Sequence, residues 1–156
     1  MLYTCVYNSV LGNIKISADE KSILTVSFTN EAVNFLNKNE IIDKTILQLN
    51  EYFEGKRRVF DLEINLKGTD FQKRVWNELL KIPYGETRTY KDIAIKIENE
   101  KSYRAIGNAC NKNPVAIIIP CHRVIGKDNK IVGYAFGENL KKSLLYIETK
   151  NKKFLI

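Results

Sequence analysis

Residues 113–126 read NPVAIIIPCHRVIG, and the rest of the chain is interpreted outward from this stretch. The apolar run is rich in β-branched residues, which predicts a buried strand. Pro120 cannot donate a ladder hydrogen bond and is expected to end that strand. Cys121 would then stand at the mouth of a core element, next to His122, the only histidine in the chain. A thiol beside an imidazole can be held as the thiolate, which is the form that attacks carbon.

The residues around the cysteine decide between two interpretations, because a cysteine after a strand is more often a small buried hydrophobe than a nucleophile. Pro-Cys-His-Arg-Val at 120–124, preceded by Asn-Pro-Val and an aliphatic run, closely resembles the active-site signature of the O6-alkylguanine-DNA alkyltransferases, also called methylated-DNA–protein-cysteine methyltransferases. The resemblance extends from about Thr69 to Glu148 and continues more weakly over the N-terminal part. It implies DNA repair by direct reversal, with irreversible single-turnover transfer of an alkyl group from O6-alkylguanine, and O4-methylthymine as well, to Cys121. It implies no cofactor.

The charge is unevenly divided along the chain. Residues 1–70 carry 8 Lys/Arg against 10 Asp/Glu, a net −2, and residues 71–156 carry 17 against 8, a net +9. A basic half attracts polyanions through phosphate neutralisation and counterion release, so nucleic acid is the leading partner. The resemblance implies that this partner is double-stranded DNA containing O6-alkylguanine. A solvated lysine-rich surface explains the charge alone equally well.

Cysteine usage and the N-terminal residues indicate the cellular compartment. Three cysteines without close spacing argue against a disulfide framework, and a single histidine leaves too few ligands for a zinc site. The first residues lack the charged and apolar regions of a signal peptide, and no apolar run could span a bilayer. We therefore expect a cytoplasmic protein without a metal or a membrane partner, and we expect it to be a monomer.

The first part of the chain predicts an α/β lobe. Residues 2–29 alternate loosely between apolar and polar positions and are interrupted by turn residues, which predicts three short antiparallel strands. Apolar residues at spacings of three and four predict a helix over 42–53, and a further strand is expected at Asp61–Leu66. By resemblance, residues 1–68 form an RNase-H-like scaffold domain without chemistry of its own.

The second part, residues 69–156, is predicted to be a mostly helical active-site domain. Thr69 to Gln72 has the form of a capping box at a helix start, and Thr89 to Asp92 has the same form. Ser102 is expected to cap a third helix, so that two short helices joined by a polar turn make a winged-helix-like helix-turn-helix candidate. The fold class is therefore α/β (α+β), with an antiparallel N-terminal sheet followed by a helical domain that ends in the helix carrying Glu148.

The resemblance assigns catalytic roles to single residues. Cys121, His122 and Glu148 match the family's Cys-His-Glu relay, in which the interval from cysteine to glutamate is 27 residues (148 − 121). Asn113 matches the hinge asparagine that fixes the cysteine loop, and Tyr90 would donate its hydroxyl proton toward N3 of the extruded base. Without the resemblance, the glutamate would be interpreted as a solvated helix residue and the tyrosine as a half-buried aromatic.

The resemblance also implies contacts to the substrate base. Ala135, next to Tyr134, would present its backbone N–H to O6, and the carbonyls of Cys121 and Val124 would accept from the exocyclic amine, contacts that strengthen as charge develops. After Tyr-Ala the family usually carries small residues, whereas this chain has Phe136. The ring could narrow the pocket toward methyl adducts or point outward, and the sequence leaves both open.

DNA contacts are expected from the helix-turn-helix and the loop after the cysteine. By resemblance the third helix enters the minor groove, and its arginine fills the gap left in the stack by the extruded base. A surface salt bridge is the competing explanation for this arginine. The small residues of the helix permit close approach to DNA, although core packing explains them about as well. The expected contact residues are Arg104, Lys91, Ala105, Gly107, Asn108 and Lys127.

Two other classes of function are weighed against repair. A non-catalytic protein that binds alkylated DNA would carry another residue at the cysteine position, so Cys121 argues against it. A thiol hydrolase would need an oxyanion site or a peptide-binding feature, neither of which is evident, and its cysteine and histidine would be distant along the chain.

Overall fold

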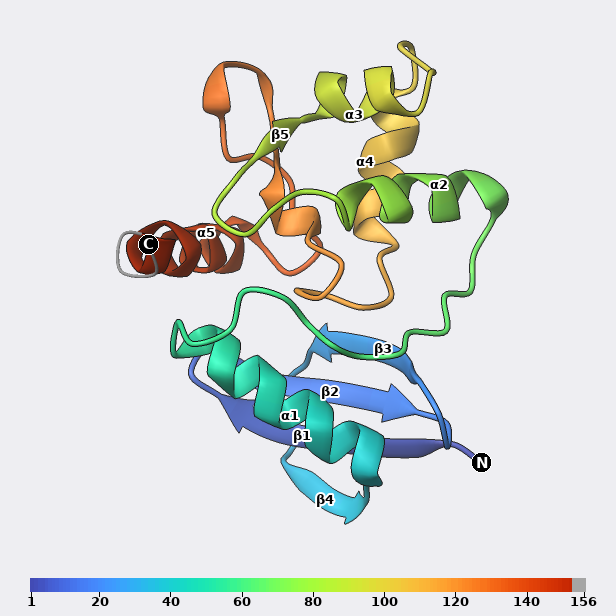
Figure 1. Ribbon diagram of the computed structural model, residues 1–156, viewed down its shortest axis with the longest axis vertical. Coiled ribbons are helices and arrows are strands. Elements are labelled where there is room, and N and C mark those ends of the chain that lie inside the picture. The colour runs from blue at the N-terminus through green and yellow to red at the C-terminus, as the bar shows by residue number, and fades with distance from the viewer. Residues whose placement is uncertain (153–156) are drawn as a thin grey trace. The chain divides into compact units, whose positions relative to one another are not determined.

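The structure, a computed structural model, describes residues 1–152 and divides into two compact units. Unit 1 comprises Met1–Lys67 and Pro114–Ala116, and unit 2 comprises Gly68–Asn113 and the chain from Ile117 onward. Unit 1 holds an antiparallel sheet and one long helix, and unit 2 is mostly helical (Figure 1). The α/β fold class expected from the sequence is therefore confirmed.

Unit 1 is built on a four-stranded sheet in the order β3-β2-β1-β4. As the alternation predicts, β1 (Tyr3–Ser9), β2 (Gly12–Ala18) and β3 (Ile23–Phe28) are consecutive antiparallel strands. The fourth strand, β4 (Asn34–Asn37), pairs antiparallel with β1 and was not predicted. All four of its residues are exposed, so it lacks the inward-facing apolar positions that identify a strand in a sequence.

Helix α1 (Glu40–Phe53) packs against β1 and β2 and covers one face of the sheet (Figure 1). Its first turn is capped by the Asn39 side chain, which accepts from the backbone N–H of Ile42 at 3.1 Å. The helix is followed by Gly55, whose φ of 78° lies in the left-handed region that favours glycine. The apolar face of α1 completes the core of unit 1, with Ile42, Leu49 and Tyr52 fully buried.

The strand predicted at Asp61–Leu66 is wrong. Only Ile64 forms a bridge, parallel to Ile23 of β3. The backbone of Asp61 is instead bound by a buried side chain of α1, because Gln48 Nε2 donates to the Asp61 carbonyl at 3.1 Å and the Asp61 N–H donates to Gln48 Oε1 at 2.9 Å. A glutamine thus supplies the hydrogen bonds that a neighbouring strand would have made.

Unit 2 contains four helices and a short two-stranded parallel sheet. Helix α4 packs against both α2 and α3 (Figure 1). Within residues 1–152, no helix is long and apolar enough to cross a membrane. The elements are α2 (Asp70–Leu79), β5 (Arg88–Thr89), α3 (Tyr90–Lys96), α4 (Tyr103–Asn111), β6 (Val124–Ile125) and α5 (Glu138–Lys152).

The two predicted capping boxes are confirmed. In α2 the Thr69 hydroxyl accepts from the N–H of Gln72 at 3.1 Å, and the Gln72 side chain accepts from the N–H of Thr69 at 2.9 Å. In α3 the same pair of bonds joins Thr89 and Asp92 at 3.0 and 2.9 Å. Each box satisfies two backbone donors that a helix start leaves unpaired, which is why these two boundaries could be located from the sequence.

The turn between α3 and α4 completes the helix-turn-helix arrangement. Glu98 adopts a left-handed φ of 57°, and the chain then folds back so that the Asn99 N–H donates to the Ala94 carbonyl at 2.9 Å. Ser102 stands at the N-cap position of α4, but the predicted side-chain cap is wrong. Its hydroxyl donates to the Asn99 carbonyl at 2.6 Å and so stabilises the turn instead of the helix.

The strand predicted before the cysteine is also wrong, although the burial expected for it is right. Residues 115–119 are each no more than 7% exposed. Val115 forms a single parallel bridge with Val26, and Ile117 then takes a φ of 72°, a left-handed conformation that strains a β-branched residue. The run therefore turns instead of continuing as a strand. It leads into a single 3-10 turn at Cys121–Arg123.

Candidate active site

Cys121 opens the 3-10 turn and is only 5% exposed. Its Sγ accepts a hydrogen bond from Asn113 Nδ2 at 3.2 Å. The same amide nitrogen donates to the Ile119 carbonyl at 2.8 Å. Because a side-chain amide has two N–H donors, Asn113 can hold the sulfur and the chain that precedes it at the same time. This hinge residue and the cysteine, both predicted site residues, are therefore in direct contact.

His122 and Glu148 form a buried pair that joins the cysteine turn to α5. The His122 Nε2 and Glu148 Oε2 atoms are 2.6 Å apart, and both side chains are almost fully buried. Arg123 adds two further bonds to the same carboxylate, from Nε to Oε1 at 2.8 Å and from Nη2 to Oε2 at 3.1 Å. The backbone N–H of Gly85 also donates to Oε1, at 3.0 Å. The sequence did not point to Arg123 as a partner of this carboxylate.

The hydrogen bonds of Glu148 determine which nitrogen of His122 carries its proton. An ionised carboxylate can only accept, so Nε2 must be the protonated nitrogen in the neutral ring. Nδ1 then carries a lone pair, and within residues 1–152 this buried atom has no hydrogen-bond partner. The structure thus leaves a proton acceptor on the residue next to Cys121.

Burial sets the charge states of this cluster. It lowers the pKa of His122, and the hydrogen bond and negative charge of Glu148 only partly oppose this effect. Burial by itself would raise the pKa of Glu148, but hydrogen bonds from His122 and Arg123 hold it well below its usual range. Burial raises the pKa of Cys121, against the opposing hydrogen bond from Asn113. Both shifts favour the uncharged pair, a thiol beside a neutral imidazole.

Lys141 of α5 is a buried charge that sequence reasoning missed. Its ammonium donates to the carbonyls of Val124, Val132 and Gly133 at 2.5, 2.9 and 2.9 Å and is fully buried. It therefore ties the segment after the cysteine turn to the loop that leads to the predicted base-binding residues. The Val124 carbonyl, assigned by resemblance to the guanine amine, already accepts one bond from this lysine. Lys141 also opposes the rise in the pKa of Cys121, because its positive charge favours the thiolate.

Two phenol groups lie within electrostatic reach of the sulfur. Burial raises the pKa of Tyr90 to about 12, with smaller contributions from Cys110 and Cys121, so its hydroxyl keeps its proton at neutral pH. A side chain at Gly133 would lie 3.5 Å from the Tyr90 hydroxyl, which brings this hydroxyl close to the loop held by the buried lysine. Tyr134 has a buried hydroxyl with no partner in the described part of the chain, and burial raises its pKa far above the usual range.

Phe136 packs against the neighbouring tyrosine. The Tyr134 and Phe136 rings meet edge to face, with centroids 5.6 Å apart and an interplanar angle of 74°. Ala135, between them, is exposed. The Phe136 ring therefore contacts Tyr134, one of the predicted base-binding residues.

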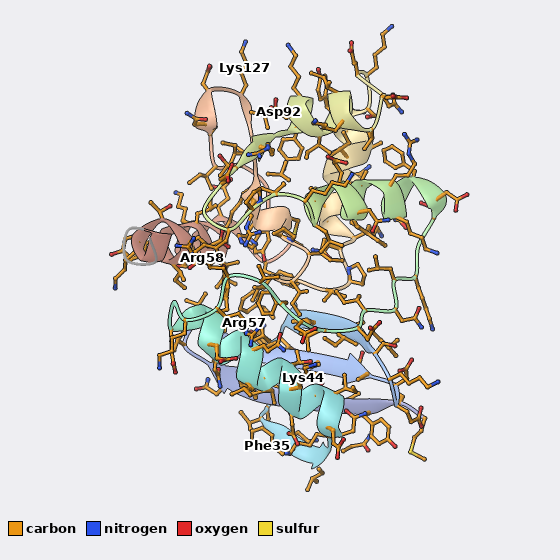
Figure 2. The ribbon with its side chains drawn as sticks, in the orientation of Figure 1. Phe35, Lys44, Arg57, Arg58, Asp92 and Lys127 are labelled. Carbon is orange, nitrogen blue, oxygen red and sulfur yellow. The ribbon has the colours of Figure 1, made fainter. Side chains whose placement is uncertain are left out.

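The residues predicted to contact DNA lie on exposed surface of unit 2. Those of α4 are exposed except for Gly107, which is half-buried. A side chain added at Gly107 would meet nothing within 4 Å, so internal packing does not require a glycine there. Arg104 makes no salt bridge with any residue in the described range 1–152. Lys91 of α3 is also exposed. So is Lys127, which lies in the loop after β6 and is labelled in Figure 2.

A surface hollow of about 600 Å³ joins α3, α4 and the loop after β6. Tyr90 lines it, which connects the exposed surface to a predicted catalytic residue. None of the described residues forms a group of three or more His, Cys, Asp or Glu side chains that could hold a metal ion. The residues lining the hollow are Thr89, Tyr90, Lys91, Tyr103, Lys127 and Asp128.

Comparison with known families accounts for both halves of the chain. Residues 1–66 match the family model described as 6-O-methylguanine DNA methyltransferase, ribonuclease-like domain, and residues 70–150 match the one described as 6-O-methylguanine DNA methyltransferase, DNA binding domain. The chain belongs to the 6-O-methylguanine DNA methyltransferase family. The resemblance inferred from the residues around Cys121 is thereby confirmed.

Relatives within this family are similar over almost their whole length. The methylated-DNA–protein-cysteine methyltransferase of Methanosarcina barkeri is 44% identical, covering 96% of this chain and 99% of its own. The probable methyltransferase of the same name from Acanthamoeba polyphaga mimivirus is 44% identical, over 90% and 93% of the two chains. The crystal structure of the Mycobacterium tuberculosis O6-methylguanine methyltransferase has a TM-score of 0.88 at 38% identity, covering 97% and 94%. The structure of Mycobacterium tuberculosis OGT in complex with DNA has a TM-score of 0.84 at 40% identity, covering 94% and 92%.

One signal in the sequence could have identified the buried lysine of this family member. Lys141, Leu144 and Glu148 fall at positions i, i+3 and i+7 of one helix, and all three are buried. Because these three positions share one face of the helix, a lysine there is expected to be buried with the leucine and the glutamate. The apolar residues Leu140 and Ile147 of the same helix are both only half-buried.

Proposed function

We propose that this protein repairs double-stranded DNA by transferring the alkyl group of O6-alkylguanine, and the methyl group of O4-methylthymine as well, irreversibly to Cys121. The observation that carries the proposal is a buried Cys121 held by Asn113 and followed directly by His122, whose ring is bound to the buried carboxylate of Glu148. Alkyl transfer from methylated DNA to a cysteine is also the activity that the names of its relatives state. Residues 1–68 serve as a scaffold, and the chain acts as a monomer.

The reaction follows from the protonation states of the cluster. The Cys121 proton passes to Nδ1 of His122, and Glu148 stabilises the imidazolium that forms. The thiolate attacks the alkyl carbon, so that a carbon–sulfur bond forms as the carbon–O6 bond breaks and the purine leaves with the electron pair. Tyr90, which retains its proton, donates toward N3, and the backbone N–H of Ala135 donates to O6. Both contacts neutralise the charge that develops on the leaving base.

A single event per molecule is expected because no residue near the sulfur, in the part of the chain that the structure describes, can displace the alkyl group from it. The product is an uncharged thioether at Cys121. The buried thiol of Cys110 has a strongly raised pKa, chiefly through burial, and so remains protonated and unreactive. No cofactor or second nucleophile is required, and the protein is consumed stoichiometrically.

Labelled DNA distinguishes repair from binding alone. The protein is incubated with duplex DNA that carries a radiolabelled O6-methylguanine, and the label is then located by peptide mapping. Label on Cys121, up to a limit of one methyl group per chain, supports repair. Tight binding of the same DNA without transfer would instead support the alternative, a non-catalytic alkylated-DNA-binding protein.

We expect Arg104→Ala to weaken the capture of damage from duplex DNA without changing the reactivity of the thiol. An arginine that fills the gap left by the extruded base offsets part of the unstacking cost, which is a few kcal/mol, so repair of duplex DNA should slow by roughly 10- to 100-fold. Single-stranded DNA leaves no gap to fill, so its repair rate should change little. The two rates are measured side by side with O6-methylguanine oligonucleotides. Lys142→Ala, an exposed lysine of α5, is the matched control, and an unchanged duplex rate for Arg104→Ala would refute the role.

Gly107→Ala is expected to stabilise the protein while weakening its binding to DNA. Glycine within a helix costs about 1 kcal/mol relative to alanine, and the added methyl group meets no atom within 4 Å. The melting temperature should therefore rise by about 2–4 °C. The same methyl group stands on the predicted DNA face of α4 and would hold the helix away from the groove. Thermal unfolding and duplex affinity are measured together, and a rise in both would show that the glycine is not needed for close approach.

A further inference from the structure

The hollow beside Tyr90 has a second aromatic lining residue, Tyr103, to which none of the roles above applies. Tyr90 comes from α3, whereas Tyr103 is the first residue of α4. The volume of about 600 Å³ lies within the range of small-molecule pockets, roughly 300–1,000 Å³, which is enough for a nucleotide.

Tyr103 is exposed at the first residue of α4. Its side chain is 46% exposed. Within residues 1–152 it makes no hydrogen bond, ion pair or ring contact. It directly precedes Arg104, so both side chains belong to the start of the helix that is expected to contact DNA.

The charges around the hollow favour a nucleic-acid strand. Lys91 and Lys127 line it together with one acidic residue, Asp128, which leaves a net positive rim. Figure 2 shows Lys127 at the outer end of its loop, on the same side of unit 2 as α3. A positively charged rim next to an exposed aromatic ring, here that of Tyr103, is a combination by which proteins hold unpaired nucleotides, through phosphate attraction and stacking.

We propose that Tyr103 stacks on the extruded base while that base passes from the duplex toward Cys121. The proposal rests on the proposed function, because it needs a base that leaves the helix. Stacking would stabilise the extruded nucleotide before chemistry, so Tyr103 would act on damage capture and not on the transfer step. Base–aromatic stacking tolerates any base, so this residue would serve O6-alkylguanine and O4-methylthymine alike.

The test compares Tyr103→Ala and Tyr103→Phe with the exposed tyrosine of α5, Tyr146→Ala, as the control. Methyl transfer from an O6-methylguanine duplex should slow roughly tenfold for Tyr103→Ala and remain within about twofold of wild type for Tyr103→Phe, because phenylalanine keeps the ring. Reaction with free O6-methylguanine, which needs no extrusion, should be unchanged. Slowing with both substrates would indicate a damaged pocket, and slowing with neither would remove any role for the ring; either result overturns the proposal.

A second measurement separates this proposal from the proposed function. In a Cys121→Ser background, affinity for an O6-methylguanine duplex relative to an undamaged duplex reports base capture without transfer. Tyr103→Ala should lower that preference by roughly tenfold. If wild-type protein failed to accept methyl groups but this preference still fell, repair would be wrong and the stacking role would stand. An unchanged preference would overturn the stacking role even in a protein that repairs.

Discussion

Serine in place of Cys121 is expected to abolish methyl transfer while leaving DNA affinity unchanged. The sulfur is the atom that forms the new bond, and a serine hydroxyl in the same buried place would be a far weaker nucleophile toward carbon. Because Cys121 is only 5% exposed, its replacement leaves the DNA-facing surface intact. Transfer is measured as radiolabel retained by the protein, and affinity as binding of the same duplex.

A matched control for this substitution is Cys110→Ser, which changes the other buried thiol of unit 2. We expect that variant to accept one methyl group per chain, as wild type does. Label remaining on Cys121→Ser, or its loss from Cys110→Ser with the fold intact, would place the acceptor elsewhere.

Glu148→Gln should have the largest effect on stability. The carboxylate binds His122, Arg123 and the Gly85 N–H, and the substitution leaves the Arg123 guanidinium buried without a counter-charge. Breaking a buried ion pair in this way costs about 3–5 kcal/mol. For a chain of this size the melting temperature should fall by roughly 6–20 °C. Transfer should also slow, because the imidazolium formed at His122 would lose its stabilising charge. Calorimetry and single-turnover kinetics measure the two effects.

The stability difference between wild type and Glu148→Gln should depend on pH. The folded-state pKa of Glu148 lies below its unfolded value of about 4.3, so the folded state favours the ionised form. Its contribution to stability is therefore complete above that unfolded value and is lost as the pH falls toward the folded pKa. Urea unfolding at pH 7, 5 and 3 should give a difference that is constant between pH 7 and 5 and smaller at pH 3.

Glu138→Gln, at the exposed start of the same helix, is the control for both measurements. It should leave stability and transfer close to wild type, since a solvent-exposed carboxylate contributes little. A Glu148→Gln protein with normal stability at pH 7 would contradict the buried cluster. A difference that grew as the pH fell would contradict the direction of the pKa shift.

Local chemistry explains which elements could be located from the sequence. The boxes at Thr69 and Thr89 satisfy backbone donors within four residues, so two helix starts were predicted correctly. The strand expected before Cys121 is absent from residues 115–119, because an apolar run predicts burial but does not determine the backbone conformation, which depends on contacts with the rest of the chain. Strand β4 was not predicted. Its side chains are all exposed and show no apolar alternation, and it is a strand because it pairs with β1.

The sequence by itself determined the family, through the residues around Cys121, and with it the nucleophile, its imidazole neighbour and the helix expected to meet DNA. These assignments depend only on residue identities and short spacings, which are the same in the unfolded chain as in the folded one. Only the tertiary structure decided the charge states, because a pKa depends on the burial and partners that distant segments provide. It brought Arg123 and Lys141 into the interior as buried charges, and it buried the Cys121 sulfur, which raises the pKa of that thiol. Desolvation is a property of the folded core, and no stretch of sequence contains it.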